Sequence, residues 1–325
     1  LILISVLSPF CKIKPDGTTY IKLLDFDGTT NGSYPYGSLI SDGTFLYGMT
    51  YGGGTNDLGT IFKIQPDGTG YVKLIDFDGT TNGSYPNGDL FSDGTFLYGM
   101  TSGGGTNDFG TIFKLKPDGT GFITLLEFNG SANGSNPYGS FVSDGTFLYG
   151  MTNSGGPDNF GTLFKILPNG TGYSKLHDFG GTSNGSYPSG SLFFDGTSLY
   201  GMTSSGGANG DGVIFKIMPD GTGFSKLLDF NGSFHGSNPY GSLISDGTFL
   251  YGMTNYYGNN DYGTIFKIMP DGSNFQTLLD FDGIATGGNP YGSLISDGTV
   301  LYGLTDSGGS SDLGTVFKIK PDGTN

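Results

Sequence analysis

Apolar and aromatic residues recur along the chain in short runs that end at Gly, Asp or Pro. One stretch illustrates the pattern, with runs at Ser38–Gly43, Thr44–Thr50, Gly59–Ile64 and Tyr71–Phe77. Within the second run every other residue is large and apolar, which is typical of a strand with one buried face. The dipeptide Asp42-Gly43 between the first two runs favours a tight hairpin. No stretch keeps a 3.6-residue apolar period, so we expect an all-β protein with almost no helix.

This pattern repeats every 51 residues without insertion or deletion. Six tyrosines share one position of the repeat: Tyr47, Tyr98, Tyr149, Tyr200, Tyr251 and Tyr302. Six phenylalanines share another: Phe62, Phe113, Phe164, Phe215, Phe266 and Phe317. Residues 20–325 therefore hold six whole repeats, and a period of this length with four strands per unit indicates propeller blades.

The fold prediction is a six-bladed β-propeller with four antiparallel strands in each 51-residue blade. Five blades are continuous in sequence, whereas the last has its first three strands in residues 292–320. Its fourth strand would come from Tyr20–Phe26, a three-plus-one closure. The alternative is an open solenoid with unpaired end strands. Gly48 and its equivalents lie in the middle of strands, which predicts close packing between neighbouring blades.

Residues 1–19 lie outside the six repeats, and we predict that residues 20–325 form the propeller domain. Phe10–Gly17 is in phase with Val316–Gly323, so the third strand of the closing blade is encoded twice. Cys11 replaces a repeat phenylalanine, which indicates a small packing residue rather than a catalytic thiol. One interpretation of residues 1–19 is a signal-peptide remnant or a degenerate half-repeat. The other is an arm that adds a strand to a second copy; its assembly residues would be Leu1, Ile2, Leu3, Ile4, Val6 and Leu7.

The repeat unit resembles the GloVer-type tandem repeat of secreted bacterial proteins. The resemblance rests on the LYG-T pattern, the GG loop, GT-[IVL]-FKI and the Leu-x-x-Phe strand before a Pro-Gly turn, and it covers nearly all of residues 20–325. It implies an exported, surface-associated protein with a propeller-like fold, and it implies no particular activity.

Composition and charge exclude several function classes. Lys+Arg 14 against Asp+Glu 29 gives a net charge of −15. A negative field of this size opposes binding to nucleic acid and to anionic membrane surfaces. No apolar run is long enough for a membrane span. The single cysteine allows no disulfide within the chain.

Candidate catalytic and metal chemistry is sparse. His177 and His235 depart from the repeat, but they fall at different positions of adjacent repeats. We interpret them as drift at tolerant positions rather than as a two-histidine metal site. No known nucleophile, zinc or phosphate-loop motif is present. We predict no catalytic residues, no metal site and no cofactor.

Acidic pairs such as Asp25-x-Asp27, Asp76-x-Asp78 and Asp280-x-Asp282 raise the alternative of weak calcium binding. The same position of other repeats lacks one or both carboxylates, so turns closed by Asp side chains are the preferred interpretation.

Longer loops carry tyrosine among Asn, Ser and Thr, a composition suited to stacking on sugars and hydrogen bonding to them. The predicted ligand-binding residues are Tyr36, Tyr138, Tyr240 and Tyr291. The alternative is that these rings pack between blades. Four N-x-[ST] sequons share one position of the repeat and are candidate glycosylation sites: Asn31, Asn82, Asn133 and Asn184.

The leading functional hypothesis is a non-enzymatic, secreted structural protein of the cell surface or extracellular space that forms filaments through its N-terminal arm. The runner-up is a carbohydrate-binding adhesin that uses the tyrosine-rich loops. A repeat in which each unit has the same residues favours a scaffold over an enzyme.

Overall fold

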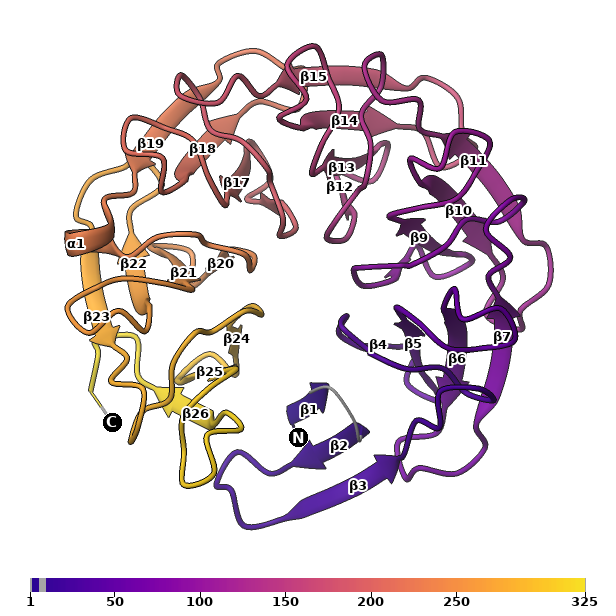
Figure 1. Cartoon of the computed structure of the whole chain (residues 1–325), viewed down its shortest axis with the longest axis horizontal. Coiled ribbons are helices and arrows are strands. Elements are labelled where there is room, and N and C mark those ends of the chain that lie inside the picture. Colours follow the sequence, from indigo (N-terminus) through magenta and orange to yellow (C-terminus); the bar gives the residue numbers. More distant parts are fainter. Residues whose placement is uncertain (1, 6–9, 325) are drawn as a thin grey trace. The chain divides into compact units, whose positions relative to one another are not determined.

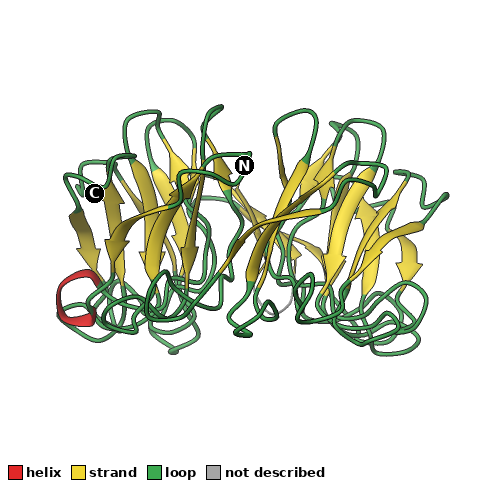
Figure 2. Cartoon of the chain, turned by 90° about the horizontal axis from the view of Figure 1, so that it is seen from above, coloured by secondary structure: helices red, strands yellow, loops and turns green. Residues whose placement is uncertain are grey.

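The protein is all-β. A computed structural model describes residues 2–5 and 10–324, and for residues 2–5 and 10 it describes the backbone only. Strands joined by loops and turns make up nearly all of this part of the chain (Figure 2). The exception is α1, a single turn at Gly232–His235, and within the described ranges no helix has the length and hydrophobicity to span a bilayer. The chain divides into two compact units, residues 1–141 with 166–173, and residues 142–165 with 174–325.

The first unit contains two complete blades and one smaller sheet. The blades have the strand order β4-β5-β6-β7 and β11-β10-β9-β8, so each is an up-and-down antiparallel sheet (Figure 1). Their bounds are β4 Ile40–Ser41, β5 Leu46–Thr50, β6 Thr60–Ile64 and β7 Val72–Asp76, then β8 Phe91–Ser92, β9 Leu97–Thr101, β10 Thr111–Leu115 and β11 Ile123–Glu127. The smaller sheet is β1 Ile2–Ser5, β2 Phe10–Ile13 and β3 Tyr20–Leu24.

The second unit carries the remaining four sheets, three with four strands and one with three. Their strands are β12 Val142–Ser143, β13 Leu148–Thr152, β14 Thr162–Ile166, β15 Ser174–Asp178, β16 Phe193–Phe194, β17 Leu199–Thr203, β18 Val213–Ile217, β19 Ser225–Asp229, β20 Ile244–Ser245, β21 Leu250–Thr254, β22 Thr264–Ile268, β23 Gln276–Asp280, β24 Ile295–Ser296, β25 Leu301–Leu304 and β26 Val316–Ile319. The predicted propeller fold with four-stranded blades is confirmed; five repeats form complete blades, and the sixth contributes β24–β26.

The predicted three-plus-one closure is wrong. Strand β3, the expected fourth strand of the last blade, pairs instead with β2, and the sheet of β24–β26 has three strands. The reason is that β2 is the second copy of the third-strand sequence and lies only a short turn away, so the hairpin closes at small entropic cost. Cys11 within β2 is buried, and burial raises the pKa of its thiol, in agreement with a packing role.

Each blade begins with a hairpin that the sequence specifies directly. Asp42 accepts hydrogen bonds from the backbone N–H groups of Thr44 and Phe45, both at 2.7 Å. Its second oxygen accepts one from the Tyr47 hydroxyl at 2.8 Å. The turn aspartate therefore fixes both the loop and the repeat tyrosine, which explains why every repeat has Asp and Tyr at this spacing.

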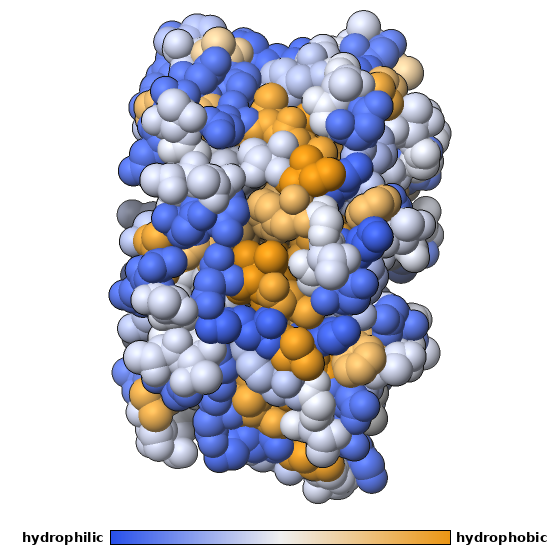
Figure 3. Space-filling model, turned by 90° about the vertical axis from the view of Figure 1, so that its right-hand side faces the viewer, coloured by the Kyte–Doolittle hydropathy of each residue, from blue (hydrophilic) through white to orange (hydrophobic). Residues whose placement is uncertain are grey.

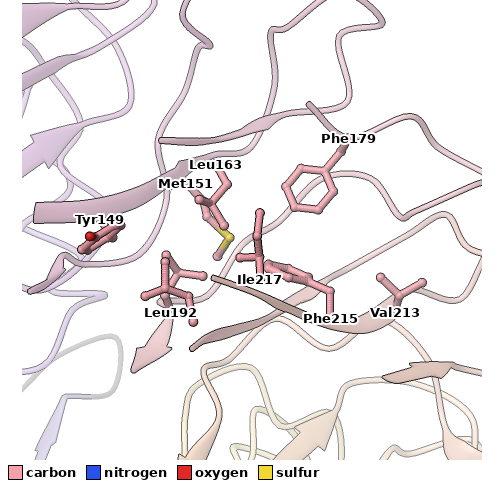
Figure 4. Packing of buried hydrophobic residues seen from close by; sticks show 9 residues of the cluster. Tyr149, Met151, Leu163, Phe179, Leu192, Val213, Phe215 and Ile217 are labelled. Carbon is pink, nitrogen blue, oxygen red and sulfur yellow. The ribbon is translucent and has the colours of Figure 1, made fainter. Parts of the chain in front are cut away.

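The cores form between consecutive blades. In the second unit, Figure 4 shows Tyr149, Met151, Leu163 and Phe179 of one blade meeting Leu192, Val213, Phe215 and Ile217 of the next. The rings of Phe179 and Phe215 lie 5.3 Å apart at 62°. A fourth-strand phenylalanine thus packs edge-on against the third-strand phenylalanine of the following repeat, an arrangement that aromatic pairs favour.

The mid-strand glycines make room for these third-strand rings. A Cβ atom on Gly99 would lie 2.4 Å from Cζ of Phe113, the residue opposite it in the β9–β10 register. The sequence correctly predicts close approach at this glycine, but its partner is a ring of the same blade and not of a neighbouring one. The blade contact is made by the ring itself, because Phe113 faces Phe77 of the preceding repeat.

Lysines of the third strands add a polar contact between blades. Lys63 donates to the carbonyl of Pro117 at 3.3 Å, and Lys165 and Lys267 do the same to Pro219 and Pro321 at 3.1 Å. The fourth strands leave apolar side chains partly uncovered, and Figure 3 shows apolar residues gathered in a band on that face. Val72 of β7 and Ile123 of β11 are 44% and 50% exposed.

Gly99→Ala is expected to lower the free energy of unfolding by about 1–3 kcal/mol, because the buried Phe113 ring cannot move aside. Thermal unfolding followed by circular dichroism should show a fall in Tm of roughly 2–6 °C. The matched control is Gly292→Ala, where an added Cβ has no neighbour within 4 Å. Equal Tm values for the two variants would contradict this account of the glycine.

Candidate functional site

The acidic pairs serve the turns. Asp27 accepts hydrogen bonds from the N–H groups of Thr29, Thr30 and Asn31, which lowers the pKa of its carboxyl group. Asp25 forms an ion pair with Lys22 at 2.6 Å. The interpretation as a turn-closing residue therefore holds for Asp27, whereas Asp25 pairs with a lysine. Across the described residues no group of three His, Cys, Asp or Glu residues could hold a metal ion.

The two histidines pack separately against phenylalanine rings. His177 of β15 stacks on Phe224 with centroids 3.8 Å apart and an interplanar angle of 5°. His235 lies edge-on to Phe275 at 4.7 Å. Burial lowers the pKa of both imidazoles. His177 thus occupies an apolar packing position of the repeat, whereas His235 stands where Asn31 and Asn82 support the loop.

The predicted tyrosines belong to Pro-x-Gly loops. Two of these glycines are needed in the first unit, because a Cβ on Gly37 would lie 2.3 Å from the carbonyl oxygen of Gly88, and one on Gly88 would lie 2.1 Å from that of Gly139. The loops of these successive repeats therefore touch through their backbones. Tyr36, which precedes Gly37, is 54% exposed.

Four tyrosines of the first unit form a continuous aromatic strip, which we define as Tyr34, Tyr36, Tyr51 and Tyr85. Their ring centroids are separated by 6.1 Å for Tyr34–Tyr36, 5.3 Å for Tyr36–Tyr51 and 5.1 Å for Tyr51–Tyr85. The first and last of these pairs are stacked, at 25° and 30°. Tyr138 is half-buried, and burial raises its pKa with a smaller contribution from Tyr51.

Two members of the aromatic strip have an unfavourable backbone. Tyr34 and Tyr85 have φ angles of 55° and 57°, in the left-handed region that bulky residues avoid. The same position of the other repeats holds Tyr187, with a φ of 57°, and Asn136, Asn238 and Asn289 with nearly the same φ; asparagine tolerates this conformation better. Because Tyr187 has the same backbone outside the strip, the run of stacked rings, and not the strain, marks the strip as a candidate site.

The second unit has a shorter counterpart. Tyr240 and Tyr291 stack with centroids 4.8 Å apart at 24°, and Tyr291 is 61% exposed. Of the four predicted tyrosines, the structure therefore pairs Tyr240 with Tyr291, and in the first unit it places Tyr36 in the strip.

Hydrogen bonds from backbone N–H groups to side chains link successive repeats two residues after the position of these tyrosines. In the second unit the N–H groups of Ser191 and Ser242 each donate to the serine hydroxyl 51 residues later at 2.8 Å. In the first unit Asp89 holds the serine position. Its N–H donates to the Ser140 hydroxyl at 2.6 Å, and its carboxylate accepts from the Ser38 N–H. Burial raises the pKa of Asp89.

The predicted glycosylation and assembly residues stay predictions. The side-chain amides of Asn31 and Asn82 donate to the carbonyls of Asp25 and Asp76 at 2.9 and 3.0 Å, so they already support the loop. Ile2, Leu3 and Ile4 lie in β1 and pair with β2 of the same chain. Leu1, Val6 and Leu7 lie outside the described residues.

Sequence reasoning missed Tyr34, Tyr51, Tyr85 and Asp89. Two of them are visible as departures from the repeat: Tyr51 is the only aromatic residue at its position of the six, and Asp89 the only aspartate at its own, whereas Tyr34 and Tyr85 share their position with Tyr187. Comparing each position across the repeats would have found Tyr51 and Asp89. Their proximity could not be inferred, because it depends on how loops from different repeats meet.

The profile of the Gloeobacter/Verrucomicrobia repeat matches residues 9–142, 91–198 and 185–325. No curated protein sequence matches the chain. Among solved structures, the Niastella koreensis GH74 enzyme is similar with a TM-score of 0.67 and 15% identity over 96% of this chain. This chain spans 49% of that enzyme.

Two further structures share the fold. An oligogalacturonate lyase from Vibrio parahaemolyticus has a TM-score of 0.58 and 12% identity, with 95% of this chain and 82% of the lyase covered. A chain of a nidogen/laminin complex has a TM-score of 0.52 and 15% identity, with 85% and 88% covered. At these identities the likeness concerns the fold alone.

Asp89→Ser is expected to raise Tm at neutral pH. The pKa of Asp89 is higher in the folded protein than in the unfolded chain, so its ionisation favours unfolding once the pH exceeds the unfolded value. The gain in Tm should therefore be present at pH 7.5 and should fade as the pH falls.

Asp93→Ser is the control, because turn hydrogen bonds lower the pKa of Asp93. Loss of the Asp93 carboxylate should therefore lower Tm at pH 7.5. A gain for Asp89→Ser that persists unchanged at pH 3 would refute the assignment.

Proposed function

This chain belongs to the Gloeobacter/Verrucomicrobia repeat family, and from that premise we propose that it is a secreted, non-enzymatic protein that binds carbohydrate through its tyrosine-rich loops. The observation that carries the proposal is the aromatic strip of stacked, exposed rings. Flat tyrosine faces stack on the C–H faces of sugar rings, and their hydroxyl groups exchange hydrogen bonds with sugar hydroxyls. The protein would act as an adhesin of the cell surface or extracellular space.

The exposure of the stacked rings supports a binding role. Tyr34 and Tyr36 are 49% and 54% exposed, and their rings stack at 25°. Packing between blades, the alternative explanation of the loop aromatics, does not account for neighbouring rings that stay this exposed.

A non-enzymatic role is the more economical proposal for a repeated scaffold. Catalysis needs different groups that converge on one substrate atom, whereas most positions here are copied in every repeat. One similar structure is a lyase, but a shared fold at 12% identity does not carry an activity to this chain.

Tyr36→Ala is expected to weaken carbohydrate binding about tenfold, the loss of one stacking partner. A glycan array identifies the oligosaccharide that binds wild-type protein, and isothermal titration calorimetry then measures Kd for wild type and variant. Tyr20→Ala serves as the control, because Tyr20 is 59% exposed but lies on strand β3. If wild-type protein binds no glycan on the array, the proposed function is wrong.

A second proposal concerns self-association by strand addition. Among the described strands, β1 and β26 each end a sheet of three strands, and edges of this kind favour pairing with another chain. Filament formation through residues 1–19 would use the edge of β1.

Deletion of residues 1–19 should then abolish assembly while leaving a folded monomer. Light scattering after size-exclusion chromatography measures the mass, and negative-stain images show whether wild-type protein forms filaments. A monomeric wild-type protein, or a truncated protein of unchanged assembly state, would count against the arm.

A further inference from the structure

We propose that the Asp89 carboxylate is the polar contact of a single carbohydrate site on the first unit, and that this site selects uncharged glycans. The inference rests on the proposed carbohydrate-binding function and adds the position and selectivity of the site. It is argued from the place of Asp89, from a second departure beside it, and from the chemistry of the groups present.

Asp89 lies between the loop segments that carry the exposed Tyr36 and the half-buried Tyr138. Its carboxylate accepts the N–H of Ser38, two residues after Tyr36. Its own N–H donates to the hydroxyl of Ser140, two residues after Tyr138. The carboxylate therefore sits below the loops of three consecutive repeats, in the unit that contains the aromatic strip.

Tyr51 is a second departure, and like Asp89 it contacts the loop that carries Tyr36. The equivalent residues of the other repeats are Ser102, Asn153, Ser204, Asn255 and Asp306. Its ring joins Tyr36 to Tyr85 at 5.3 and 5.1 Å, so without Tyr51 the strip would break into separate tyrosines. Two residues that each occur once in six repeats thus contribute to one place, which chance drift at scattered positions does not explain.

The loops supply the chemistry of a hydroxyl-binding site. A carboxylate has about four acceptor positions, and its bonds to sugar hydroxyls are charge-assisted and therefore stronger than those of a neutral group. Asp89 is half-buried, and its Oδ1 lies against the loop of Tyr36, 3.0 Å from where a Cβ on Gly37 would be. Because the chain carries a net charge of −15, anionic sugars such as uronates are repelled.

Asp89 is also not required by the fold. Serine makes the same inter-repeat hydrogen bond at Ser242 and Ser293, whereas a carboxylate at this position is held in a desolvated environment that raises its pKa. An aspartate that costs stability where serine suffices is typical of a residue kept for binding. The second unit keeps serine beneath Tyr240 and Tyr291, so we expect weaker binding there.

The experiment measures Kd by calorimetry at pH 7.5 for a panel of probes. The neutral probes are the hexaoses of cellulose, starch, xylan and mannan, and the anionic probe is hexagalacturonate. Asp89→Ser restores the residue of the other repeats and is expected to weaken binding of the neutral probe by about tenfold, the loss of one charged hydrogen bond. Asp220→Ser is the charge-matched control, because Asp220 caps an exposed turn of the second unit, and it should bind as wild type does.

The outcomes separate this inference from the proposed function. Loss of binding in Asp89→Ser, with a Tm no lower than wild type and unchanged binding in Asp220→Ser, supports the inference. Wild-type affinity in Asp89→Ser together with weakened binding in Tyr36→Ala overturns it and leaves carbohydrate binding intact. Preference of wild-type protein for hexagalacturonate overturns the selectivity. If wild-type protein binds none of the probes, both the inference and the proposed carbohydrate-binding function are wrong.

Discussion

The structure depends on the contact between two phenylalanines of consecutive repeats. In each unit the fourth-strand ring of one repeat packs against the third-strand ring of the next, as in Phe77–Phe113 at 5.6 Å and Phe230–Phe266 at 5.4 Å. A single sheet of four short strands has too little apolar surface to be stable alone. Burial of these rings between sheets therefore provides the stability that no single repeat could reach, as in other repeat proteins.

Other repeated features follow from this contact. The mid-strand glycine lets the third-strand ring lie flat across its own sheet, and the hairpin aspartate holds the tyrosine that completes the core. The third-strand lysine donates to the turn of the next repeat. Since the same contacts recur in successive blades, a residue that differs in one repeat alone is not explained by the core. Tyr51 and Asp89 are the clearest residues of this kind.

The separation between scaffold and site has an energetic basis. The core positions are filled by the same residues in nearly every repeat, and replacing these residues would disrupt the packing between two blades. The loop positions tolerate Tyr, Asn or Ser, because each can satisfy the turn. At Asp89 the chain holds a residue that costs stability where the other five repeats have serine. Such positions are where proteins place binding groups.

The sequence by itself determined the all-β class, the 51-residue blade with four strands, the turn roles of aspartates such as Asp42, and the packing role of Cys11. These follow from local chemistry and from the 51-residue periodicity, both of which can be read from a single sequence. The three-plus-one closure predicted from the sequence was wrong, because two copies of the third strand compete for pairing with β3. The nearer copy, β2, pairs with it at lower entropic cost. Loop composition predicted Tyr36 as a candidate binding residue, but it did not predict its neighbours Tyr51, Tyr85 and Asp89. Only the tertiary structure decided which loop residues meet, because that depends on backbone contacts between loops about fifty residues apart, such as the approach of Gly37 to Gly88.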